Sequence, residues 1–149
     1  MAERIIVRQN HMLETEILAA DPHVADADHL HPVVHVHELT PYGLMLSGLA
    51  ACTAIVLHTY AQHHGLELHK VELRADYDRV FAEDCEDCEG IEEYKERIEE
   101  EILLSGDLTP EERKRLFMVS KHCPIHKIIS HGIEVNSYLG EDTVPDETD

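Results

Sequence analysis

The sequence predicts a mixed α+β fold, and three stretches of the chain carry that prediction. Residues 71–78 alternate strictly between apolar and charged side chains, which is typical of a half-buried strand. Residues 41–64 form a long apolar segment that begins at Thr40-Pro41, a threonine and proline suited to the start of a helix. A second helix start follows at Thr109, where Glu112 completes a capping box.

The N-terminal part is expected to contain two short strands followed by a loop. Residues 4–7 and 13–18 contain the isoleucine, valine and leucine of strands and flank a polar turn at residues 9–11. Residues 21–32 are rich in aspartate and histidine and favour a polar loop. Residues 33–37 fit either a third strand or a loop that leads into the helix.

The helix over residues 41–64 is apolar around nearly its whole circumference. Its 24 residues would span roughly 36 Å before Gly65 ends it. Such a helix must be buried on all sides, and a domain of 149 residues can hardly enclose one so long. We therefore expect a homodimer in which a second copy covers part of it. The circumference comprises Leu44, Met45, Leu46, Leu49, Ile55, Val56 and Leu57, with the small residues Gly48, Ala50, Ala51 and Ala54 between them.

The second half of the chain is less uniform. Residues 91–104 fit a helix through the spacing of their isoleucines and a strand through Ile98, Ile102 and Leu104. The second helix should run to about His122, a short third helix should end at Gly132, and residues 133–139 should form a closing strand. We expect a single domain over residues 1–139, interrupted by an acidic Cys-x-x-Cys insertion at 81–91 and followed by a disordered acidic tail at 140–149.

The charge of the chain excludes several classes of partner. The formal net charge is −19, which disfavours nucleic acid and anionic membranes because both require basic surfaces. Residues 44–57 are apolar but only 14 long, shorter than the roughly 20 residues of a membrane span. The N-terminus lacks a signal core, so we expect a cytoplasmic protein with reduced cysteines.

Cys52 and Cys123 are the candidate catalytic residues. Cys52 lies inside the long apolar helix, and Cys123 stands at a helix start before a proline, where the helix dipole favours a thiolate. The alternative for Cys52 is a small core residue without chemistry. His122 and His126 flank Cys123 and would either shuttle protons or lie on the surface.

Two further clusters offer metal donors, although the sequence predicts no metal site or cofactor. Cys85 and Cys88 have the spacing of a metal knuckle, but one such pair supplies only two ligands. His35 and His37 would share one face of a strand. A metal- or redox-responsive protein using these cysteines and the histidines is therefore one alternative function. The histidine-rich stretch comprises His29, His31, His35 and His37.

Together, these motifs resemble the OsmC/Ohr family of osmotically inducible protein C and organic hydroperoxide resistance proteins. The resemblance is carried by the stretch from Thr40 through Cys52, by Gly106-Asp-Leu-Thr-Pro-Glu-Glu, and by Cys123-Pro-Ile-His-Lys. It covers about residues 33–139. It implies an intertwined homodimer with central buried helices packed against antiparallel sheets, and a strand near residues 94–105.

The same resemblance implies an enzyme, a peroxiredoxin-like organic hydroperoxide reductase with an antioxidant role. Cys52 would be the peroxidatic thiol, Cys123 would resolve its sulfenic acid to a disulfide, and an external dithiol would reduce that disulfide. The partners would be a hydroperoxide substrate, the dithiol and a second copy of the chain.

The chain departs from the family at the groups that activate the peroxidatic thiol. The family carries an acid just after the proline, where this chain has Tyr42 and Gly43, and only Arg4 and Arg8 lie near the first strands as candidates for its arginine. The alternative is a non-catalytic protein of the same fold that binds a small apolar ligand at the dimer interface.

Overall fold

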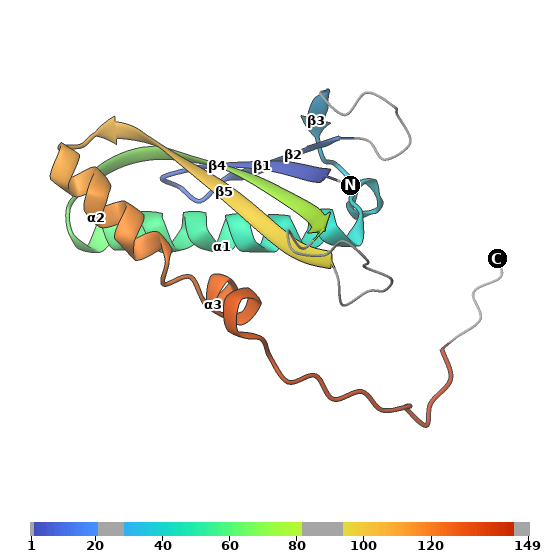
Figure 1. Ribbon diagram of the computed structural model, residues 1–149. Coiled ribbons are helices and arrows are strands. Elements are labelled where there is room, and N and C mark those ends of the chain that lie inside the picture. The colour runs from blue at the N-terminus through green and yellow to red at the C-terminus, as the bar shows by residue number, and fades with distance from the viewer. Residues whose placement is uncertain (1, 21–28, 82–93, 145–149) are drawn as a thin grey trace.

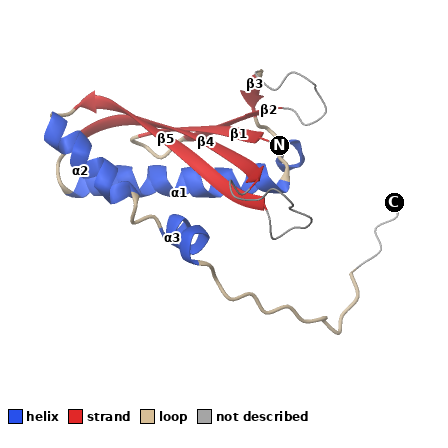
Figure 2. Cartoon of the chain, viewed as in Figure 1, coloured by secondary structure: helices blue, strands red, loops and turns tan. Residues whose placement is uncertain are grey.

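The computed structural model describes residues 2–20, 29–81 and 94–144 and confirms the α+β fold class (Figure 1). Its antiparallel sheet has five strands in the order β3-β2-β1-β4-β5, and Figure 2 shows the helices below it. The strands are β1 (Ala2–Asn10), β2 (Thr15–Ala20), β3 (Leu30–Pro32), β4 (Glu67–Phe81) and β5 (Tyr94–Asp107). The α-helices are α1 (Pro41–His63), α2 (Pro110–Ser120) and α3 (Pro124–His131), and a 3₁₀ turn spans Val36–Glu38.

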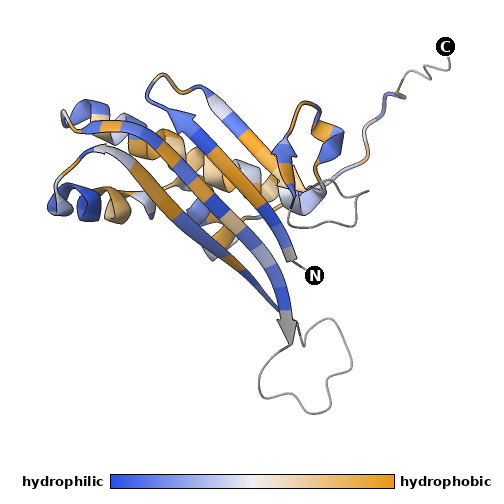
Figure 3. Cartoon of the chain, turned by 90° about the horizontal axis from the view of Figure 1, so that it is seen from above, coloured by the Kyte–Doolittle hydropathy of each residue, from blue (hydrophilic) through white to orange (hydrophobic). Residues whose placement is uncertain are grey.

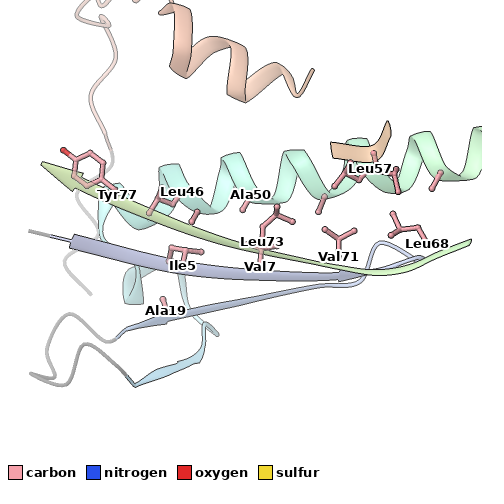
Figure 4. Packing of buried hydrophobic residues seen from close by; sticks show 14 residues of the cluster. Ile5, Val7, Ala19, Leu46, Ala50, Leu57, Leu68, Val71, Leu73 and Tyr77 are labelled. Carbon is pink, nitrogen blue, oxygen red and sulfur yellow. The ribbon is translucent and has the colours of Figure 1, made fainter. Parts of the chain in front are cut away.

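The core lies between α1 and one face of the sheet (Figure 4). The alternation in β4 places Val71, Leu73 and Ala75 on this inner face, each fully buried, and Leu46 and Leu57 of α1 are buried with them. Thr40 caps α1 by accepting from the Gly43 N–H at 3.0 Å, as predicted. By length and composition α1 could cross a bilayer, yet half of its most apolar window is buried inside the protein, which is how a core helix behaves.

The N-terminal strands confirm the prediction, but the loop after them needs correction. Residues 30–32 form β3, which pairs with Leu18–Ala20, where the sequence favoured a polar loop to residue 32. Residues 33–37 are not a strand. The Glu38 carboxylate accepts hydrogen bonds from the N–H groups of Val34 and His35, which removes those donors from any strand ladder and turns the chain toward α1.

Residues 94–107 form a strand, so the helical alternative for residues 91–104 is wrong over that part. β5 pairs with β4 along its whole length, from Phe81–Tyr94 to Glu67–Asp107. This long ladder explains why strand pairing overrides the helical spacing of the isoleucines. The acidic insertion that contains Cys85 and Cys88 lies outside the described residues, except for Phe81, the last residue of β4.

The C-terminal part confirms the two helices and contradicts the closing strand. Thr109 and Glu112 form the predicted capping box, and α3 ends before Gly132. Residues 133–139 pair with no strand in the described part of the chain and run away from the body of the protein (Figure 1). Tyr138 and Leu139 are 92% and 97% exposed. The apolar residues of this segment pair with no sheet edge formed by the described residues of their own chain. Of the expected acidic tail, residues 145–149 lie outside the described part.

A buried histidine makes the fold sensitive to acid. His58 of α1 is 1% exposed, and its Nε2 lies 3.0 Å from the Gln9 carbonyl oxygen, so the neutral ring donates there. Burial is the main cause that lowers the pKa of His58 below its ordinary value of 6.5, while the bond to Gln9 opposes the shift. His58 is therefore neutral in the folded state, and its contribution to the free energy of unfolding is fully present above pH 6.5.

We expect this contribution to be lost as the pH falls below 6.5 and through the lowered pKa of the folded state. The measurement is urea unfolding at pH 7.5 and pH 5.5 for the wild type and His58→Gln, whose amide keeps a donor without titrating. The variant should lose less stability between the two pH values than the wild type. Equal losses would contradict the assignment.

Candidate active site

The fold brings Cys52 and Cys123 together. Cys52 lies midway along α1, and Cys123 is the N-cap of α3, which packs against α1. The residues of the turn between α2 and α3 determine where the third helix begins. The second helix ends at Ser120, and Pro124 occupies the first turn of α3. The Cys123 thiol lies near enough to Cys52 to be one of the causes that raise the Cys52 pKa.

Cys123 is fully buried and serves as a cap. Its Sγ accepts from the His126 backbone N–H at 3.5 Å, the geometry that serine or threonine would adopt at the same position. The thiol therefore faces the positive end of the α3 dipole, as the sequence predicted. Figure 1 shows α3 beneath α1, with the turn that carries Cys123 leading into it.

Cys52 is half-buried, and its surroundings favour the protonated form. Burial is the largest cause that raises its pKa above the ordinary value of 9.0, followed by the contact with Cys123. The backbone N–H of Ile125 opposes the shift, and the negative charge of Glu100 adds to it. At neutral pH, Cys52 is therefore a thiol unless another group accepts its proton.

Glu100 is a site residue that the sequence reasoning missed. In the β4–β5 register it stands opposite Ala75, on the inner face that Ile98 and Ile102 also occupy. Burial raises its pKa to about 7, and its Oε2 atom has no hydrogen-bond partner among the described residues. Three consecutive acids such as residues 99–101 ordinarily indicate a solvated surface. Once a strand is assumed, the alternation alone puts Glu100 on the inner face.

A pocket of about 660 Å³ lies near the two cysteines, neither of which is among its lining residues. Leu49, one turn before Cys52, and His126, one turn after Cys123, both line it, as does Glu100. The remaining wall combines apolar and polar side chains: Met45, Tyr77, Glu96, Arg97, Ile98, Ile102, Phe117, Ser120, Lys121, Ile129 and Ser130. The pocket therefore offers apolar contacts together with charged groups and one partly buried carboxyl group.

The basic and histidine candidates are not gathered at the thiols. Arg4 and Arg8 lie on the outer face of the sheet and pair with Asp76 at 2.7 Å and Glu72 at 2.6 Å. Figure 3 shows hydrophilic and hydrophobic residues alternating along the strands. Among the described residues, no arginine is a cause of the Cys52 pKa shift. His122 is exposed, whereas His126 is half-buried at the pocket.

Tyr42, which stands where the family carries an acid, belongs to a polar cluster that shares Tyr77 and Glu96 with the pocket wall. Its ring stacks on Tyr77 with centroids 4.5 Å apart, and its hydroxyl accepts from Arg79 at 3.3 Å. Glu96 accepts from both the Tyr77 hydroxyl, at 2.8 Å, and Arg79, at 3.2 Å. An arginine and a glutamate are thus present near the start of α1, held by two tyrosines.

The metal hypothesis receives no donor set from the described residues. The rings of His35 and His37 stack with centroids 5.4 Å apart. Within residues 2–20, 29–81 and 94–144, no group of three His, Cys, Asp or Glu side chains converges as metal ligands would. Cys85 and Cys88 lie outside this part of the chain.

Comparison with known proteins gives a consistent family match. The family described as OsmC-like protein matches residues 35–137. The crystal structure of an OsmC-like hydroperoxide resistance protein from Jannaschia sp. CCS1 superposes with a TM-score of 0.58 at 15% identity, covering 95% of this chain and 96% of the other. The organic hydroperoxide resistance protein OhrB of Bacillus subtilis gives 0.48 at 17% identity, covering 87% and 90%. No curated protein sequence matches the chain.

Proposed function

The chain belongs to the OsmC-like protein family, and from that premise we propose that it is a thiol-dependent hydroperoxide reductase. The single observation that carries the proposal is the proximity of Cys52 and Cys123, two thiols 71 positions apart in the sequence that the packing of α3 against α1 brings together. The nearby pocket has apolar side chains in its wall that suit the organic group of a hydroperoxide.

The reaction takes place in three steps. The Cys52 sulfur attacks the distal peroxide oxygen, so that the O–O bond breaks and the alcohol leaves while Cys52 becomes a sulfenic acid. Cys123 then attacks the oxidised sulfur, and water leaves as the disulfide forms. An external dithiol reduces that disulfide by exchange and restores both thiols.

The test is consumption of cumene hydroperoxide and hydrogen peroxide by the full chain with dithiothreitol as the reductant. We expect turnover with both, and faster turnover with cumene hydroperoxide because its phenyl group can pack against the apolar side chains of the pocket wall. Loss of peroxide at the rate of buffer and dithiothreitol alone, with both thiols remaining titratable, would reject the proposal.

A non-catalytic ligand-binding role is the second candidate, and the raised pKa of Cys52 favours it. A thiol held protonated is a poor nucleophile. In this case the pocket would hold a small apolar molecule, and the thiols would stay reduced in the presence of peroxide. Native mass spectrometry of the purified chain distinguishes the two roles, because a bound apolar molecule together with peroxide-inert thiols supports binding alone.

We also propose that the chain functions as a homodimer. Leu44 and Ile55 of α1 are 43% and 44% exposed, although both are large apolar residues of a predominantly apolar helix. Residues 133–139 extend from the body of the protein with their apolar side chains exposed. A second copy would cover the exposed face of α1, and each chain's extended segment would pack against the other.

Light scattering after gel filtration tests this arrangement. We expect twice the chain mass of 17.0 kDa for the full chain, and the monomer mass for a variant that ends at Gly132. Circular dichroism serves as the control, because the described part of the removed segment, residues 133–144, contains no helix or strand, so the spectrum should stay nearly unchanged. A full-length chain that stays monomeric at 100 µM, about ten times a usual working concentration, would contradict the dimer.

A further inference from the structure

We propose that Glu100 carries the proton from Cys52 to the leaving oxygen of the peroxide. The inference rests on the proposed peroxide reduction and adds Glu100, which no sequence motif indicates, to the two thiols. The starting observation is that Glu100 places a carboxyl group on the apolar inner face of the sheet.

The position of Glu100 is set by the strand register. Its neighbours on the inner face, Ile98 and Ile102, pack against the core, and the small Ala75 opposite leaves room for the longer side chain. Its neighbours in sequence behave differently. Glu99 and Glu101 are exposed on the outer face and pair with Arg97 at 3.5 Å and Arg74 at 3.7 Å.

Glu100 lines the same pocket as His126, which follows Cys123 by three residues. Its Oε2 atom is buried and accepts no hydrogen bond from the described residues, which is costly for a carboxylate and much less so for a neutral acid. Its charge is also one of the causes that raise the pKa of Cys52, so the two groups are neighbours. Both observations fit a carboxyl group that changes protonation state in step with the thiol.

Other titratable groups face the same pocket. The thiols come from α1 and the start of α3, and the remaining groups come from β4, β5, the end of α2 and α3: Tyr77, Glu96, Arg97, Lys121 and His126. Burial alone is the cause of the raised pKa of Glu100, so none of these charges determines it. A pKa of about 7 allows Glu100 to accept and return a proton at neutral pH.

The proton and electron balance closes without a further reactant. The Glu100 carboxylate accepts the Cys52 proton as the sulfur attacks the distal oxygen of ROOH. The S–O bond forms, the O–O bond breaks, and sulfur is oxidised while the peroxide is reduced. The leaving RO⁻ takes the proton from the Glu100 carboxylic acid and departs as ROH, which leaves Cys52 as a sulfenic acid and Glu100 as a carboxylate.

This relay predicts a particular pH profile. The reactive state holds one proton shared between Cys52 and Glu100, so its population rises with pH up to about 7 and stays level until the Cys52 thiol ionises. Without Glu100, only the free thiolate reacts, and its population rises about tenfold per pH unit below the thiol pKa.

The experiment compares the wild type, Glu100→Gln and the matched control Glu101→Gln by single-turnover oxidation of Cys52 with cumene hydroperoxide from pH 6 to 9. We expect Glu100→Gln to react about 100-fold more slowly at pH 7.5 and to lose the plateau. Glu101→Gln, whose side chain lies on the outer face, should keep the wild-type rate and profile.

The opposite result would identify a purely electrostatic role. The negative charge of Glu100 raises the Cys52 pKa, so its removal alone would increase the thiolate fraction and speed the reaction. A Glu100→Gln rate equal to or above that of the wild type, with an active wild type, overturns the relay and leaves the proposed function standing. An inactive wild type rejects the proposed function itself. Circular dichroism checks that both variants are folded.

Discussion

Replacing Cys52 by serine is expected to abolish peroxide turnover, lowering the rate by about a thousandfold or more, to the level of the uncatalysed reaction. Serine is close to cysteine in size, so a half-buried position in α1 should tolerate it. The hydroxyl cannot take up the distal peroxide oxygen as a sulfenic acid, so no bond to oxygen forms. The measurement is cumene hydroperoxide consumption at pH 7.5 with dithiothreitol.

Cys123→Ser separates the two thiol roles. Serine is a preferred helix cap, so it should keep the His126 contact and the α3 helix. We expect this variant to consume one equivalent of peroxide per chain in the absence of reductant and to accumulate a Cys52 sulfenic acid that a dimedone reagent traps. The wild type should instead form the Cys52–Cys123 disulfide.

The chain has two other cysteines, which supply the matched control. The double variant Cys85→Ser and Cys88→Ser should retain turnover within about twofold of the wild type, because the proposed chemistry needs only Cys52 and Cys123. Turnover that persists in Cys52→Ser, or disappears only when Cys85 and Cys88 are replaced, would show that the peroxidatic thiol has been assigned wrongly.

Those elements that local chemistry determines could be predicted from the sequence. Thr40 and Thr109 each accept the N–H three residues on, and each precedes a proline, so both helix starts depend on short contiguous motifs. Cys123 could likewise be placed at a helix start from Pro124 alone. The strict alternation in residues 71–78 also identified a strand, because a strand with one buried face requires an apolar residue at every second position.

The elements that depend on distant partners could not be predicted from the sequence. β3 exists because Leu18–Ala20 offers it a pairing edge, and nothing within residues 30–32 indicates that edge. Residues 133–139 contain the isoleucine, valine and tyrosine typical of a strand, yet they remain unpaired in the described part of their own chain. Propensity indicates that a segment can be a strand, whereas a hydrogen-bonding partner decides whether it becomes one.

The candidate site divides in the same way. The two cysteines could be named from their motifs, although their contact depends on α3 packing against α1. The position of Glu100 on an apolar face could not be inferred while residues 91–104 also fitted a helix. In a helix, Glu100 would not share a face with both Ile98 and Ile102. The register of β5 against β4 shows that residues 94–107 form a strand. It places Glu100 on the inner face of the sheet, whereas the acids on either side of it lie on the outer face.

Replacing Gly106 by alanine is expected to destabilise the fold by about 4 kcal/mol, a large share of the 5–15 kcal/mol typical of a domain. Gly106 has a φ of 154°, and an added Cβ would overlap the carbonyl oxygen of Glu67 and lie 3.0 Å from its carbonyl carbon. Both obstacles are backbone atoms of the paired strand, so no side-chain rotation relieves them. The β4–β5 ladder has a register irregularity at this place, between Leu68 and Lys70.

The damage should spread to α2, because the helix begins three residues after the ladder ends at Asp107. Arg113 of α2 donates to the Leu104 carbonyl at 3.0 Å and to the Gly106 carbonyl at 3.5 Å, so a displaced strand loosens the helix that leads to Cys123. Urea unfolding followed by circular dichroism measures the loss. Gly140→Ala, with open space around the added Cβ, is the control and should change the free energy of unfolding by less than about 0.5 kcal/mol. A Gly106→Ala variant as stable as that control would mean that β4 and β5 do not approach each other at Gly106 as closely as the register requires.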